Sequence, residues 1–176
     1  QKTEAPLLDF KANIAGNAKG LEFDDISISF ESVGQPQLIS GAAQATWEDA
    51  LGINLNLASR WLDLDKIAVS SPSQSPFDTA RSFVSALMRA LPTDAESTFR
   101  FDLDQANLGG EAVSGIRLEV GRSKGKLLVK DLRASLPGGS RLDLDGTVAD
   151  VKKARGFQGE LALRGTSLAH FLLFAS

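Results

Sequence analysis

Two stretches of the chain, "LEFDDISISF" at 21–30 and "LLVKDLRASL" at 127–136, carry the same pattern of apolar and polar residues. In each, apolar residues alternate with polar ones, the pattern skips one position at a central Asp, and alternation then resumes. In the first stretch the skip falls between Phe23 and Ile26. Alternation with a period of two is typical of a strand with one buried face, and one extra residue is what a β-bulge absorbs. The pattern therefore predicts two bulged strands of the same kind.

The two stretches belong to a longer internal repeat. Sliding the chain along itself by 106 positions aligns 10–30 with 116–136 without a gap and, further on, aligns Leu57 with Leu163. Chance similarity between alternating strands is the alternative. Because the phase skip recurs at the same place, we favour two copies of one β-meander.

Most of the remaining chain also alternates with a period of two, and Gly, Asn, Pro and Ser fall between the alternating runs. Short connections and one-sided burial favour antiparallel pairing. One segment instead has the helical period, with apolar residues three and four positions apart from Phe77 to Leu91. Ser75 can cap this helix, and Pro92 ends it. A second short helix is expected near the end of the chain.

The expected fold class is mainly β with one or two helices, a β-rich α+β fold. It consists of a curved antiparallel sheet built from two repeated β-meanders, with a helix at about 76–91 packing on or capping the apolar face. We expect one β-rich unit over residues 1–176, divided into a first repeat at about 8–65, a helical connector at 70–92, a second repeat at 97–165 and a C-terminal helix at 167–175.

The composition excludes several classes of site. Hydrophobic residues make up 43% of the 176 residues, so a packed core can form, and the net charge of −3 with no basic cluster argues against nucleic acid. There is no Cys, which removes disulfides and thiolate chemistry. No apolar run approaches the roughly 20 residues of a membrane span. Because the chain begins with Gln1, we interpret it as a segment of a larger or processed protein.

Paired aspartates are the most conspicuous candidates for chemistry. They occur in "WLDLDKI" at 61–67, in "FDLD" at 101–104 and in "LDLD" at 142–145. Residues i and i+2 of a strand point to the same face, so each pair is expected on the solvated face, where charge opposes edge-to-edge association. A weak cation site is the alternative. A calcium site needs six to eight oxygens converging on a loop, which none of these stretches offers.

No motif indicates an enzyme. The single histidine, His170, lies in the apolar run "SLAHFLLF", and no G-x-S-x-G or phosphate-binding glycine motif is present. We therefore predict no catalytic residue, no metal site and no cofactor.

Three stretches resemble a known family. The run "GKLLVKDLRASLPGGSRLDLDGTV", the following "GFQGELALRGTSLAHFLLF" and the earlier "GINLNLASRWLDLDKI" are similar to the repeating β-rich region of AsmA-like envelope proteins, the family of AsmA, TamB and YhdP. This resemblance implies a periplasmic, β-rich protein tethered to the bacterial inner membrane by a helix outside this segment. It also implies an apolar β-groove, a role in phospholipid transport or outer-membrane biogenesis, and no catalytic residues.

The residues themselves leave two functions open. A helix of about 15 residues is about 22 Å long, whereas nine strands span about 40 Å, so part of the apolar face must curl, be covered otherwise, or stay open. An open face predicts binding of phospholipid or acyl chains, and a closed core predicts a structural or assembly module of the cell envelope. The residues expected to line the groove or core are Phe10, Phe23, Phe30, Leu55, Leu57, Phe83, Leu87, Phe101, Leu118, Val129, Leu144 and Leu161.

Overall fold

The structure is a computed structural model that describes residues 8–32, 34–67, 75–90, 92, 95–123, 126–150 and 155–175. The strands are β1 (Leu8–Asn17), β2 (Gly20–Ser32), β3 (Gln35–Thr46), β4 (Gly52–Asp63), β5 (Glu96–Leu108), β6 (Glu111–Ser123), β7 (Lys126–Leu136), β8 (Ser140–Asp150) and β9 (Arg155–Arg164). The helices are α1 (Leu64–Ile67), α2 (Pro76–Ala90) and α3 (Leu168–Ala175), and a 3₁₀ turn spans Pro137–Gly139.

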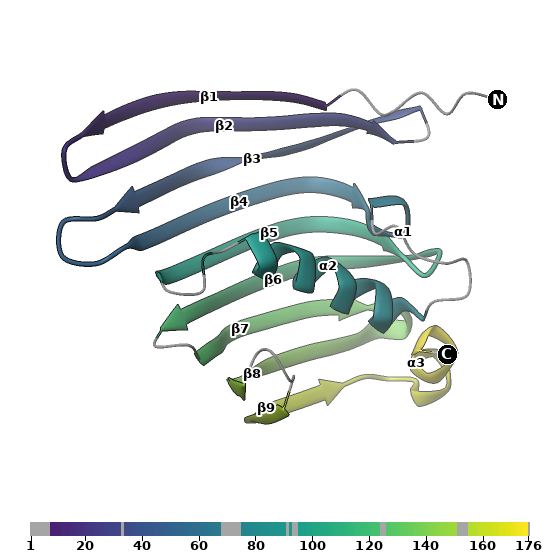
Figure 1. Ribbon diagram of the computed structural model, residues 1–176. Coiled ribbons are helices and arrows are strands. Elements are labelled where there is room, and N and C mark those ends of the chain that lie inside the picture. Colours follow the sequence, from purple (N-terminus) through teal and green to yellow (C-terminus); the bar gives the residue numbers. More distant parts are fainter. Residues whose placement is uncertain are drawn as a thin grey trace.

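All nine strands form one open sheet whose spatial order, β1 to β9, follows the chain (Figure 1). The long strands are bowed, and α2 lies across the middle of one face. This arrangement confirms the predicted fold class, a mainly β protein with a curved sheet, two meanders and a helix on one face.

One strand pair departs from the antiparallel expectation. β4 and β5 pair in parallel, with Leu55 beside Phe99 and Leu57 beside Phe101. The other neighbouring pairs are antiparallel. The chain between β4 and β5 passes through α1 and α2, and a crossover of this length is what a parallel pair requires.

The two meanders, β1–β4 and β6–β9, share strand order, strand direction and bulge position. Against β3, the register of β2 shifts between Phe23 and Ile26. Against β8, the register of β7 shifts between Val129 and Leu132. Both shifts fall where the alternation of apolar and polar residues skips one position. β5 stands between the meanders and has no counterpart among β1–β4.

The predicted alignment of the last strands is wrong by two residues. Across the paired strands, Leu57 lies level with Ile26, and the residue level with Leu132 is Leu161 rather than the expected Leu163. The connections between corresponding strands differ in length, so the offset of 106 does not persist to the end of the repeat. A two-residue difference keeps every side chain on its predicted face, because the strand period is two.

Both predicted helices begin at a side-chain cap, and for α2 it is the expected Ser75. The backbone N–H of Asp78 donates to Ser75 Oγ at 3.2 Å, and Pro76 is the first residue of α2. The N–H of His170 donates to Ser167 Oγ at 3.3 Å at the start of α3. A side-chain cap satisfies one of the amide groups that have no partner within a helix. α2 ends at Ala90, two residues before Pro92.

The core lies at the centre of the sheet, beneath α2. Phe99 and Phe101 of β5 are almost fully buried, and so is Val120 of β6. The ring of Phe83 on α2 lies 6.1 Å from that of Phe101, and Phe77 packs edge-on against Phe174 of α3 at 6.2 Å. α2 therefore covers the middle of the sheet, and α3 closes one end of the cluster.

Candidate binding surface

The face of the sheet that carries α2, called the apolar face here, collects all the predicted strand residues. The strand register places one row of side chains level across the sheet, and this row includes Ile26, Gly41, Leu57, Phe101, Leu118, Leu132, Leu144 and Leu161. A neighbouring row includes Ile14, Phe23, Ala43, Leu55, Phe99, Val120 and Val129. Residues far apart in the sequence thus form one continuous surface.

The apolar face is closed in the middle and open at both edges. The main cluster of buried residues comes from β4–β7, α1 and α3, and Ile26 of β2 and Gln37 of β3 are also buried. On β1, Phe10 and Ile14 are 56% and 64% exposed, and on β9 Leu161 is 64% exposed. The edges therefore present large apolar side chains to solvent, whereas the centre does not.

The predicted residues divide into three groups by burial. Phe101 and Leu118 are buried. Phe23, Phe30, Leu55, Leu57, Phe83, Val129 and Leu144 are half-buried, and Phe10 and Leu161 are exposed. Leu87 belongs to α2, but its side chain lies outside the described residues. Phe10 and Leu161 occupy opposite edges of the sheet, so the predicted residues do not all border one groove.

Three polar residues interrupt the apolar face, and sequence reasoning missed them. Gln37 and Ser97 are 1% and 4% exposed, and Arg122 is buried. Gln37 Oε1 accepts a hydrogen bond from the backbone N–H of Asp63 at 3.0 Å, which bridges β3 and β4 beyond their last paired residues. The guanidinium of Arg122 donates to the Pro92 carbonyl at 3.3 Å, beyond the end of α2. Each of these residues lies on the same strand face as its apolar neighbours. The alternation of apolar and polar residues alone could therefore not show that a polar side chain is buried there.

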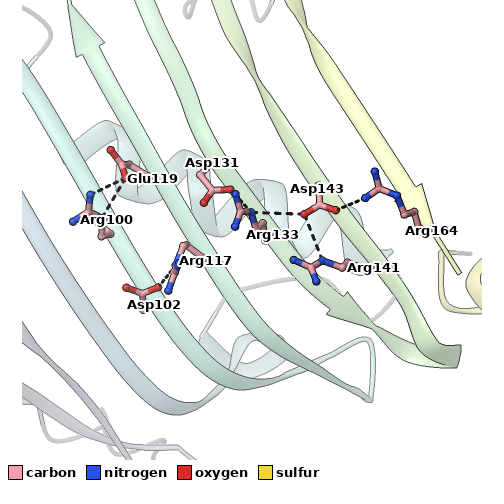
Figure 2. Close-up of polar contacts among 9 residues, drawn as sticks. All are labelled: Arg100, Asp102, Arg117, Glu119, Asp131, Arg133, Arg141, Asp143 and Arg164. Carbon is pink, nitrogen blue, oxygen red and sulfur yellow. Dashed lines mark hydrogen bonds and ion pairs between the residues drawn. The ribbon is translucent and has the colours of Figure 1, made fainter.

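The opposite face of β5–β9, called the charged face here, carries a ladder of ion pairs (Figure 2). Arg100 donates to Glu119 at 2.8 Å, and Arg117 donates to Asp102 at 2.8 Å. Further along, Asp143 lies 3.1 Å from Arg164. Asp143 also lies 3.5 Å from Arg141 and 3.7 Å from Arg133. The hydrogen bond from Arg100, together with one from Lys130, holds the pKa of Glu119 below its ordinary value against partial desolvation.

The predicted aspartate pairs have structural partners. Asp102 and Asp143 lie on the charged face as expected, in the ion pairs just described. The pair at 63 and 65 is not a strand pair, because α1 begins at Leu64. Asp65 instead accepts hydrogen bonds from the backbone N–H groups of Gly109 and Gly110, at 2.8 and 2.9 Å. Both glycines have positive φ, as a tight two-residue hairpin between β5 and β6 requires.

The described residues show no arrangement typical of a metal site. They contain no group of three or more His, Asp or Glu residues arranged to hold a metal ion. The side chain of His170 is exposed on α3 and packs beside Gly138 of the 3₁₀ turn. No helix within the described ranges is both long enough and apolar enough to cross a membrane.

Comparison with models of known families, with curated proteins and with solved structures yields no match.

Proposed function

We propose that this chain is a non-enzymatic periplasmic segment of an AsmA-like protein and that its apolar face binds the acyl chains of phospholipid. Such a segment would act in phospholipid transport or outer-membrane biogenesis. In the full-length protein it would be held at the inner membrane by a tether outside this segment.

The observation that carries the proposal is the open β1–β2 end of the apolar face. Phe10 and Ile14 of β1 are more than half exposed, and Phe23 and Phe30 of β2 are half-buried beside them. Contiguous exposed apolar surface is uncommon on soluble proteins and usually marks a binding site. The side chains form an extended strip along two strands, a shape that suits flexible hydrocarbon chains.

The chemistry of the other face supports the same proposal. The charged face holds its ion pairs in solvent, so one side of the sheet is wet while the other side is apolar. A lipid tail on the apolar face would exchange water for hydrocarbon contact, which stabilises binding by about 25 cal/mol for each Å² removed from water.

Binding of a fluorescent fatty acid to the purified chain tests this proposal. We expect saturable binding that Ile14→Asp reduces by about tenfold, because a carboxylate on this strip opposes entry of an acyl chain. Ala15→Asp is the matched control, because it places the same charge on the opposite face of the same strand and should leave binding unchanged. Absence of binding, or equal loss in both variants, would contradict the proposal.

The alternative function is a structural or assembly module of the cell envelope that binds no lipid. The packed centre favours this alternative, because Phe99, Phe101 and Val120 are almost fully buried beneath α2. A chain that binds no fatty acid but forms stable complexes with other envelope proteins would support the module over the lipid carrier.

A further inference from the structure

One strand of the repeat occurs twice in different surroundings. β1 and β6 occupy corresponding places in the two meanders, but β6 is flanked by β5 and β7, whereas among the described strands β1 has β2 alone as a neighbour. The difference is large at equivalent side chains. Val120 of β6 is 1% exposed, whereas Ile14, its counterpart on β1, is 64% exposed. In the second meander, β5 at one side and the overlying α2 together bury this strand.

The strand that flanks β6 where β1 has an open edge is β5, and its sequence has a definite pattern. β5 runs antiparallel to β6 and places Phe99 opposite Val120 and Phe101 opposite Leu118. Its apolar residues alternate with Arg100 and Asp102, which lie on the charged face. Transferred to β1 by the repeat, the same register would set an apolar side chain opposite Ile14.

We propose that the free edge of β1 binds an extended segment with the chemistry of β5. The segment lies antiparallel to β1, with large apolar side chains at every second position and a carboxylate between them. An edge strand presents a row of unpaired N–H and C=O groups, and main-chain hydrogen bonding to such an edge is an established mode of peptide recognition. This inference does not depend on lipid binding, because main-chain pairing along the edge of β1 holds the segment, although its apolar side chains would cover Ile14, which the proposed lipid-binding strip also includes.

A charged residue on β1 matches the incoming carboxylate. In the second meander, Arg117 of β6 pairs with Asp102 of β5 at 2.8 Å. The offset of the repeat places Lys11 at the position of Arg117. Among the described residues, the ion pair of Lys11 is with Asp9 of its own strand, at 2.9 Å, and the side chain of Lys11 is 75% exposed. The ammonium group of Lys11 is therefore accessible from solvent and could pair with the carboxylate of an incoming segment.

A labelled synthetic peptide with the β5 sequence, "ESTFRFDLDQANL" at 96–108, tests the inference. Fluorescence anisotropy of this peptide with the full chain should show saturable binding. A peptide of the same composition, reordered to destroy the alternation, should bind at least tenfold more weakly, because only alternation presents one apolar face. Equal binding of the two peptides would overturn the proposal, as would no binding.

A charge exchange tests the register. Lys11→Glu should weaken binding by about fivefold, because like charges opposite one another destabilise a strand pair. A peptide carrying Asp102→Lys should recover affinity for that variant. Lys66→Glu is the control, because it makes the same change in charge at an exposed position of α1 and should leave affinity unchanged.

The remaining outcomes each contradict the proposal. If Lys11→Glu leaves the affinity for the peptide unchanged, the peptide binds elsewhere, for example at the outer edge of β9. Self-association of the chain that the peptide does not compete with would show that a second copy, rather than a strand of β5 chemistry, occupies β1.

Discussion

At the scale of single residues, the bulge of β2 depends on an unusual backbone conformation. Asp25 has φ of +50° and is the non-glycine residue with positive φ among the described residues. Its carboxylate accepts a hydrogen bond from Asn13 Nδ2 at 3.0 Å, across the β1–β2 pair. Asp is one of the few side chains that tolerate this region, because a short polar group can hydrogen-bond locally. The counterpart Asp131 makes the same bulge without positive φ and pairs with Arg133 at 2.9 Å.

The two aspartates should therefore respond oppositely to glycine. We expect Asp25→Gly to be neutral or to stabilise the chain by up to about 1 kcal/mol, because glycine relieves the left-handed conformation at the loss of one exposed hydrogen bond. Asp131→Gly should destabilise by about 0.5–1 kcal/mol, because it adds backbone freedom to the unfolded chain without relieving strain. Urea unfolding midpoints of the two variants decide the matter, and equal midpoints would show that the bulges are equivalent in energy.

At the scale of elements, the sequence predicted local structure better than it predicted partners. The period of three and four from Phe77, with Ser75 and Pro92 at its ends, located α2 within one residue. Period-two alternation likewise assigned Phe101 and Leu118 to the correct face. The parallel pairing of β4 with β5 could not be predicted in this way, because alternation marks a buried face and not the direction of a neighbour.

The burial of Phe83 changes the expected cost of removing it. Full burial would predict a loss of about 3–5 kcal/mol for Phe83→Ala, but Phe83 is half-buried and contacts the Phe101 ring from one side. We therefore expect about 1.5–3 kcal/mol, the transfer cost without a fully enclosed cavity. Arg81→Ala should change stability by less than about 0.5 kcal/mol, because Arg81 and its partner Asp78 are both well exposed.

Chemical denaturation of the two α2 variants tests this expectation. A Phe83→Ala midpoint equal to that of Arg81→Ala would show that α2 is a loosely held cover rather than part of the core. In that case the same variant should show altered retention of the fluorescent fatty acid.

At the scale of the whole molecule, coverage rather than sequence pattern distinguishes the two meanders. Both carry the same alternation and the same bulge, yet one lies beside β5 and partly beneath α2, and the other ends in an open edge. Sequence reasoning expected that one helix could not cover nine strands, but it could not say which residues would remain open. That depends on the position of the β4–β5 crossover, which places α2 over the centre. Gln37 and Arg122 were missed because their partners, Asp63 and Pro92, come from distant parts of the chain. The hydroxyl of Ser97 is buried and has no hydrogen-bond partner among the described residues, so no contact explains its place on this face.

Equivalent positions in the two meanders allow this difference in coverage to be measured. We expect Val120→Thr to destabilise the chain by about 1–3 kcal/mol, because the change conserves shape but buries a hydroxyl in an apolar site. Ile14→Thr, at the counterpart position on β1, should change stability by no more than about 0.5 kcal/mol, because water already reaches that side chain. Urea unfolding of both variants in the absence of ligand gives the comparison. If Ile14→Thr proved as costly as Val120→Thr, the β1 edge would have to be covered in the free chain, and neither an exposed lipid-binding strip nor a free strand edge would exist there. A large difference that shrinks when the β5 peptide is present would instead show that an added strand buries β1 as β5 buries β6.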